Sequence, residues 1–267
     1  MYFRPVHTES HIPTLYKFIQ ENPLGVLTTA IKSESYPLLQ SSHIPWVLDV
    51  PDSSSSTSSE PQPAKLRGHM ARANPHSKAL SEAAAATLEA GGPADTKCVK
   101  LEEEVMILFT SPVHHYVTPK FYVETKPSTG KVVPTWDYSA VQCYGLITVY
   151  FDGSAPETGD YLTKQISDLS KQSEEKIFGY DGQNGRPRAW NVNESPESYV
   201  GLLKKAIIGV EIEITRIHGK WKMSQELAKG DRQGVIEGFE KLSTEVGNDI
   251  AKTVRERGAL KDEGRKE

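Results

Sequence analysis

The sequence predicts an α+β fold that is mainly β, with a barrel-like core of strands and helices added mainly towards the ends. Short apolar runs rich in β-forming residues come in closely spaced groups. They span residues 24–31, 66–71, 105–109, 142–151 and 206–217. Helical spacing of apolar residues returns at 157–172, 196–205 and 234–252. Strands and helices do not alternate regularly, which favours a barrel over a doubly wound sheet.

The first elements follow from local signals. Thr8 is a candidate N-cap for a helix whose apolar residues lie between Ile12 and Ile19, and Asn22-Pro23 ends that helix. Residues 24–31 then form a buried strand, and residues 36–48 return as a second strand after the polar turn.

The strand at 66–71 is expected to run directly into a helix. Asn74 can accept hydrogen bonds as its N-cap, and Pro75 has the fixed φ that suits a first helical position. This strand-to-helix junction is where the most informative side chains gather.

Two segments are predicted to be insertions without a core of their own. Residues 51–63 are rich in Ser and Pro, and residues 83–103 begin Ala-rich and are then broken by Gly and Pro. We expect residues 1–242 to form one domain around them. Residues 243–267 should then be a helix end and a charged, mobile tail.

Composition excludes several classes of protein. The net charge of -4 gives no general attraction to nucleic acid, so direct DNA binding is not expected. No apolar run is long enough to span a membrane, and two cysteines make neither a disulfide framework nor a zinc site. GxGxxG, P-loop and GxSxG motifs are absent from the sequence. We expect a cytoplasmic or nuclear protein without a metal site.

The first candidate site is the junction between Gly68 and Lys78. A helix start favours an anion such as phosphate, which Arg72 could grip bidentately while Ser77 and Lys78 add a hydroxyl and a charge. A capped helix with solvated basic residues explains the same pattern, so both interpretations stay open here.

The second candidate is a polar run inside an otherwise apolar strand, made of Gln40, Ser41, Ser42 and His43. Alternation directs Ser41 and His43 to one face and Gln40 and Ser42 to the other. These side chains either face water or hydrogen-bond a ligand laid across the strand.

Aromatic residues and histidines supply the remaining candidates. The stretch 116–138, with Lys126 and Trp136, could cover a flat ligand or another subunit, or could simply belong to the core. Five histidines fall near the proposed site without the spacing of a metal centre, and one of them could be an axial haem ligand: His43, His69, His76, His114 and His115.

Taken in order, several segments resemble the PaiB-like proteins, a family described as FMN-binding negative transcriptional regulators. The most specific are GHMARANPHSK and VPTWDYSAVQCYG, supported by MYFRPVH, SSHIPWVL and KMSQ, and the resemblance covers residues 1–242. It implies a split β-barrel related to pyridoxamine-phosphate oxidases and flavin reductases. It also implies a homodimer with FMN between the subunits.

The resemblance also implies roles for individual residues. Gln40, Ser41, Ser42 and His43 would line the flavin ring. The phosphate end would be held by Arg72, Asn74, Ser77 and Lys78, with His69 close by. Lys126 and Trp136 would close the site, from the partner subunit. No catalytic acid or base is implied.

The chain departs from the family pattern at three positions. The family usually has Trp where this chain has Phe121, and Asn where it has Asp137 and Glu226. If either carboxylate points at the phosphate, FMN affinity should suffer.

Three functions remain open at this point. The chain could be a flavin-dependent oxidoreductase or sensor, in which FMN supplies the redox chemistry. It could repress transcription through a partner, since no helix-turn-helix or zinc finger is visible. It could instead bind haem.

Overall fold

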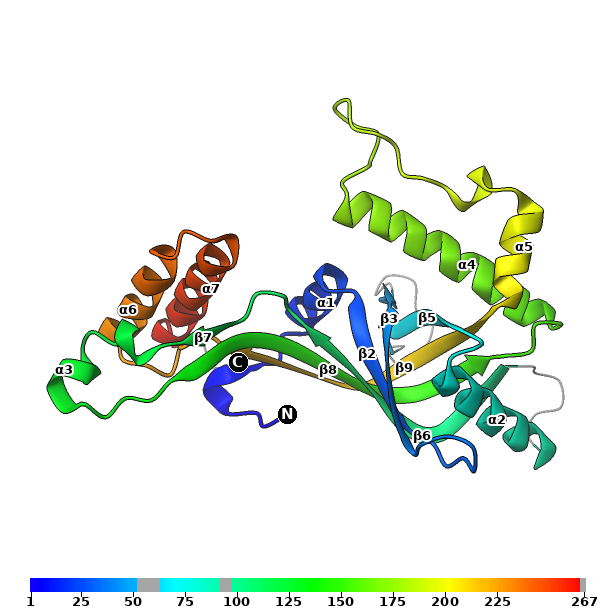
Figure 1. Cartoon of the computed structure of the whole chain (residues 1–267), viewed down its shortest axis with the longest axis horizontal. Coiled ribbons are helices and arrows are strands. Elements are labelled where there is room, and N and C mark those ends of the chain that lie inside the picture. The colour runs from blue at the N-terminus through cyan, green and yellow to red at the C-terminus, as the bar shows by residue number, and fades with distance from the viewer. Residues whose placement is uncertain (52–62, 92–97, 265–267) are drawn as a thin grey trace. The chain divides into compact units, whose positions relative to one another are not determined.

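The computed structural model describes residues 1–51, 63–91 and 98–264 (Figure 1). The chain divides into two compact units. Unit 1 comprises Met1–Asn22, Phe109–Gln142 and Ile217–Glu267, and unit 2 comprises Pro23–Leu108 and Cys143–Arg216. Most of the predicted loop at 51–63, and part of the insertion at 83–103, lie outside the described residues.

Unit 2 is built on an antiparallel sheet. Its own strands are β2 (Leu24–Ala30), β3 (Leu39–Pro45), β4 (Val47–Asp49) and β5 (Lys65–Ala71). Three longer strands begin or end in it, namely β6 (Cys98–Thr110), β8 (Thr135–Tyr150) and β9 (Ile207–Lys222). The order is β3-β2-β6-β8-β9-β5-β4.

The two ends of this order, β3 and β4, are separated in sequence by Trp46 alone. The sheet must therefore curl until its edges approach each other, as the strands of a barrel do. It stays unclosed in the described part of the chain. The predicted α+β split barrel with peripheral helices is thereby confirmed.

Alternating side chains fill the interior of unit 2. Residues with no exposed surface come from five strands, and examples are Leu27, Leu66, Ile107, Val149 and Val210. The helices of this unit are α2 (Pro75–Glu89), α4 (Pro156–Gln172) and α5 (Glu197–Lys205). Short turns of helix lie at Ser173–Ile177 and Val192–Glu194.

Helix α4 is fixed to the sheet by buried polar contacts. Tyr161 donates its hydroxyl to the carbonyl oxygens of Val210, at 2.6 Å, and of Gly68, at 3.2 Å. Its ring stacks on Tyr150 with a centroid distance of 3.9 Å. These contacts hold β5, which leads into α2, against helix α4.

Unit 1 gathers both ends of the chain. It holds β1 (Thr8–Glu9), which pairs with β9, and β7 (His115–Val117), which pairs with β8. Its helices are α1 (Ile12–Glu21), α3 (Thr125–Thr129), α6 (Lys229–Glu240) and α7 (Glu245–Asp262). Short 3-10 turns lie at Pro5–His7 and Pro119–Phe121.

The first helix and the second strand differ from their predictions. Thr8 is not an N-cap, because it lies in β1 opposite Lys220, and α1 begins at Ile12 without a side-chain cap. The predicted strand 36–48 is two strands, because the chain passes from one edge of the sheet to the other at Trp46.

The C-terminal prediction also needs correction. Residues 234–252 belong to two helices, because Ser243 has a φ of 53° and Thr244 caps α7 by accepting a hydrogen bond from the Gly247 amide. Helix α7 continues to Asp262 through the segment predicted to be a mobile tail. Arg257 anchors it through an ion pair with Glu9.

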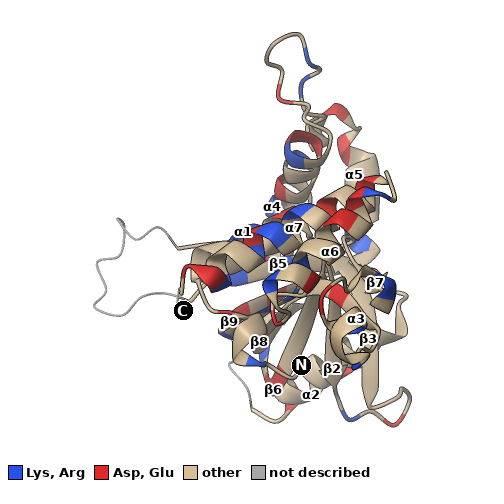
Figure 2. Ribbon diagram, turned by 90° about the vertical axis from the view of Figure 1, so that its left-hand side faces the viewer, with Lys and Arg blue, Asp and Glu red and all other residues tan. Residues whose placement is uncertain are grey.

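Charged residues are spread over the surface. In the view of Figure 2, basic and acidic segments alternate, and none of the described helices seen there is uniformly basic. No described helix is both long enough and apolar enough to cross a membrane.

Candidate functional site

The junction between β5 and α2 has the predicted form. Strand β5 ends at Ala71 and α2 begins at Pro75, with the side chain of Asn74 accepting a hydrogen bond from the His76 amide at 3.0 Å. The first turn of α2 carries no acidic residue. A helix start of this kind favours an anionic ligand.

Strand β3 meets this junction through Ser42. Its hydroxyl lies 3.0 Å from Nδ1 of His76 and 3.3 Å from Nδ2 of Asn74. The other ring nitrogen of His76, Nε2, lies 2.9 Å from the hydroxyl of Thr29 on β2. The structure therefore brings the two predicted segments, 40–43 and 68–78, together in unit 2.

His76 is the centre of this network; the sequence places it near the site but assigns it no cofactor-binding role. Burial lowers the pKa of His76 to about 4, so its ring is neutral near pH 7. The sequence signal that could have identified His76 is its position directly after the Asn74-Pro75 helix start. A residue there is buried on the side of α2 that faces the sheet.

The residues of β3 alternate as predicted. Gln40 and Ser42 are half-buried, whereas Ser41 and His43 are exposed on the opposite face. The Ser41 hydroxyl lies 2.9 Å from that of Thr28 on the neighbouring strand. Ser41 and His43 are therefore accessible to a ligand from outside the sheet.

Arg72 is engaged by the backbone. Its guanidinium donates to the carbonyl oxygens of Phe151 at 2.8 Å, Ile207 at 3.1 Å and Lys205 at 3.2 Å. These bonds hold the end of β5 against the neighbouring chain segments and occupy much of its donor capacity. Lys78, by contrast, is exposed in the first turns of α2.

Three predicted site residues carry buried polar atoms without a hydrogen-bond partner among the described residues. They are Nε2 of Gln40, Nδ1 of His69 and Oγ of Ser77. Burial also lowers the pKa of His69. Unsatisfied buried polar groups are uncommon in folded proteins, and a bound water or ion can supply the partner.

Lys126 and Trp136 belong to unit 1. Lys126 is an exposed residue of α3, and Trp136 on β8 is 53% exposed. The Trp136 ring lies beside His114 and Tyr116, with centroid distances of 6.0 and 6.3 Å. Their part in closing the flavin site stays a prediction.

The two carboxylates that depart from the family pattern have partners within unit 1. Asp137 is fully buried and accepts hydrogen bonds from the Ser224 hydroxyl at 2.9 and 3.1 Å. Glu226 lies 3.0 Å from Nε2 of His7.

The pKa values of these two carboxylates move in opposite directions. Burial raises the pKa of Asp137 to about 7, although the Ser224 bond and the charge of Lys222 oppose the rise. Burial alone would raise the pKa of Glu226, but the hydrogen bond with His7 and the charge of Lys222 lower it to about 2.

A family model described as "Putative FMN-binding domain" matches residues 1–216. The chain belongs to this family. Strand β3 and the start of α2, which Ser42 joins, both fall within the matched region. Its name gives support to a flavin cofactor and none to the haem alternative.

Members of this FMN-binding family include fungal and bacterial relatives. The chain is 59% identical over 263 residues to an uncharacterized protein of Aspergillus fumigatus, covering 98% of this chain and 99% of the relative. It is 25% identical over 236 residues to protease synthase and sporulation protein PAI 2 of Bacillus subtilis, covering 88% and 86%. The resemblance to PaiB-like proteins is thereby confirmed.

A solved structure with a related arrangement is the flavocytochrome Anf3 from Azotobacter vinelandii. It matches with a TM-score of 0.39 and 10% identity, covering 80% of this chain and 69% of that chain. Among the residues described here, no group of three or more His, Cys, Asp or Glu side chains could hold a metal ion.

Proposed function

We propose that this chain binds FMN at the junction of β3 and α2. The observation that carries the proposal is the contact of Ser42 with Asn74 and His76. It joins two family-matched segments that hold complementary groups, a polar strand and an anion-favouring helix start. This donor set suits a phosphorylated, hydrogen-bonding cofactor.

The proposed roles follow from accessibility. Lys78 neutralises the phosphate, while Ser41 and His43 offer hydrogen bonds to the polar edge of the ring. Ser42, Asn74 and His76 hold the strand and the helix in register. Arg72 positions the junction by donating to three backbone carbonyl oxygens. The guanidinium N–H groups that these bonds do not use can donate to the phosphate.

The first test removes the exposed cation. Lys78→Ala should weaken FMN binding at least tenfold, because a charge-assisted contact contributes roughly 1.5 to 3 kcal/mol. The apo protein would be titrated with FMN and binding followed by the quenching of flavin fluorescence. The urea midpoint should not change, because Lys78 is exposed.

Lys252→Ala provides the control, because Lys252 is an exposed lysine of α7 in unit 1. It should bind FMN as the unaltered protein does. Equal FMN affinity in the Lys78 variant would remove Lys78 from the phosphate site. Failure of the unaltered protein to take up FMN would reject the function as a whole.

We further propose a homodimer formed through the face that carries β3. This strand lies at one end of the sheet order, and large apolar side chains beside it are exposed. Leu24 is 58% exposed, Leu38 52% and Leu39 69%. An exposed apolar edge strand is a natural pairing surface for a second copy.

Leu39→Asp should convert the dimer to a monomer, because two introduced carboxylates would have to be desolvated at the interface. Light scattering coupled to size exclusion would give the mass. Leu242→Asp, at an exposed apolar residue of unit 1, is the matched control. A dimer that persists in the Leu39 variant would place the interface elsewhere.

The activity that fits a bound flavin is a flavin-dependent oxidoreductase or a redox-linked regulator. FMN supplies one- and two-electron chemistry, and the chain supplies its binding and orientation. Anaerobic addition of NADH or NADPH to the FMN-loaded protein should bleach the flavin absorbance if either is the donor. A sequence-selective gel shift with the pure protein would instead favour a repressor that contacts DNA directly.

A further inference from the structure

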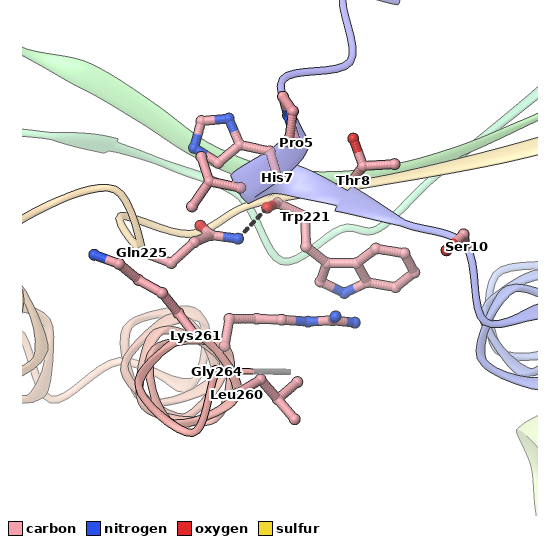
Figure 3. A pocket seen from close by; sticks show the side chains of 11 residues that line it. Pro5, His7, Thr8, Ser10, Trp221, Gln225, Leu260, Lys261 and Gly264 are labelled. Carbon is pink, nitrogen blue, oxygen red and sulfur yellow. Dashed lines mark hydrogen bonds between the residues drawn. The ribbon is translucent and has the colours of Figure 1, made fainter. Parts of the chain in front are cut away.

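A cavity of about 680 Å³ lies within unit 1, between the first residues of the chain and its last helix (Figure 3). It is formed by residues 5–8 and Ser10, the end of β9 with the turn after it, and residues 257–264 at the end of α7 and just beyond it. Pockets for small organic ligands have volumes of about 300 to 1,000 Å³. The cavity shares no residue with the proposed flavin site, and much of its wall follows residue 216, where the family match ends.

The polar wall of this cavity is basic. His7, Arg257 and Lys261 line it, and the described lining residues include no Asp or Glu. Figure 3 shows Lys261 and Leu260 extending from α7, opposite the segment that carries Pro5 and His7. The charge of the lining therefore favours an anion.

Arg257 is held rigidly in this wall. It forms an ion pair with Glu9, which is only 4% exposed, and its guanidinium carbon lies 4.3 Å from the centre of the Trp221 ring. Phe18 packs edge-on against the same side chain, with a centroid distance of 5.1 Å to the Trp221 ring. A guanidinium fixed in this way keeps further N–H groups pre-organised for a ligand.

Gln225 fixes the adjoining turn. Its Nε2 donates to the carbonyl oxygen of Trp221 and its Oε1 accepts from the amide of Met223 (Figure 3). His7 is only 5% exposed and is paired with Glu226. These walls are therefore formed before any ligand arrives, which limits the entropy lost on binding.

Lys261 is the basic residue of this wall that has no carboxylate partner in the described part of the chain. Arg257 and His7 each face a carboxylate, whereas Lys261 donates to the carbonyl oxygen of Leu227 at 3.2 Å. No ion pair with a carboxylate is recorded for it within the described chain. A ligand with one negative charge would balance this wall.

The remaining wall is apolar. Pro5, Val6 and Leu260 line the cavity together with the Trp221 indole. Burial of a hydrocarbon body against these side chains contributes roughly 25 cal/mol for each Å² removed from water. The ligand should therefore combine a hydrocarbon body with its negative charge.

We propose that this cavity binds a small organic monoanion with an apolar body, such as a hydrophobic carboxylic acid. Its carboxylate lies between Lys261 and Arg257, and its hydrocarbon part lies against Pro5, Val6 and Leu260. The site is a second ligand site, built by the two ends of the chain.

Benzoate is the probe, and calorimetric titration of the full-length protein is the measurement. Benzoate should bind saturably, and benzamide, which has nearly the same shape without the charge, should bind at least tenfold more weakly. Inorganic phosphate should also bind more weakly, because it lacks the apolar body. Lys261→Gln should weaken benzoate binding about tenfold without lowering the urea midpoint, because Lys261 is exposed.

Lys252→Gln is the matched control, because Lys252 is exposed on the same helix and does not line the cavity. It should bind benzoate as the unaltered protein does. The proposal is overturned by the absence of saturable benzoate binding, or by benzamide or phosphate binding as tightly as benzoate. Unchanged affinity in the Lys261 variant would overturn it as well.

Discussion

Arg67→Met should lower the free energy of unfolding by about 1 to 3 kcal/mol, the loss expected when buried and half-buried acceptors lose a charged hydrogen-bond donor. Arg67 on β5 is only 4% exposed and forms an ion pair with Asp49. It also donates to Asp168 at 2.7 Å and to the buried side-chain oxygen of Gln165 at 3.2 Å. Methionine retains most of the volume but removes the Arg67 donors from all three side chains, of which Asp168 keeps Lys164 as a partner.

The ionisation of Arg67 supports this expectation. Burial alone would lower the pKa of Arg67, but hydrogen bonds and charges from Asp49 and Asp168 outweigh burial and raise it. The guanidinium is therefore charged at every pH used for the measurement. Urea unfolding at pH 7 would give the free energy.

Arg216→Met is the matched control for this variant. Arg216 forms an ion pair with Glu104 at 2.7 Å, but both side chains are about half exposed. Exposed ion pairs contribute about 0 to 1 kcal/mol, so this variant should lose little stability. Equal losses in the two variants would contradict the assigned role of Arg67.

Arg67 matters for the proposed function because of where it lies. It joins α4 to β5, and β5 leads into the helix start that holds Ser77 and Lys78. We therefore expect the Arg67 variant to bind FMN normally while it is folded and to lose binding at a lower temperature.

The parts of the fold predicted correctly rest on local chemistry. Asn74 and Pro75 identify a helix start from their own side chains, and alternation along β3 separates Ser41 from Ser42. Neither inference needs knowledge of distant segments. For that reason the strand-to-helix junction could be found in the sequence.

The missed features depend on contacts between distant residues. Thr8 is a strand residue only because Lys220 lies opposite it, and α7 remains helical to Asp262 while Arg257 reaches Glu9. The phosphate role of Arg72 stays a prediction, but its bonds to the backbone could not be foreseen, because the carbonyl oxygens that accept them follow some 80 to 135 residues later. Local patterns carry no information about such partners.

The second large effect is a dependence of stability on pH that Asp137→Asn should abolish. The pKa of Asp137 is about 7 in the folded chain against an ordinary value of 3.8, and burial is the main cause. Between these values the folded state binds the proton and the unfolded state releases it. The contribution of Asp137 to the free energy of unfolding therefore falls as the pH rises from about 4 to about 7, which is opposite in sign to the contribution of the buried, neutral His76.

The size of this effect follows from the shift in pKa. Each pKa unit corresponds to about 1.4 kcal/mol. The total decrease in the free energy of unfolding, complete above pH 7, is therefore at most about 4 kcal/mol. Asparagine is neutral and can still accept the hydrogen bond from Ser224. It is also the residue that the family resemblance implies at this position. At pH 8 the variant should thus be more stable than the unaltered protein by up to about 4 kcal/mol, and at pH 5 by only about 1.6 kcal/mol.

Urea unfolding at pH 5 and pH 8 would measure both differences, with Asp249→Asn, at an exposed residue of α7, as the control. The control should leave the pH dependence unchanged. The same slope in the Asp137 variant and in the unaltered protein would show that the carboxylate is charged in the folded chain. Its charge would then have to be balanced by Lys222, whose Nζ donates to Thr135 and to the Trp136 carbonyl. Lys222→Met would distinguish these cases at pH 5, because it destabilises the chain strongly there only if Asp137 is already ionised.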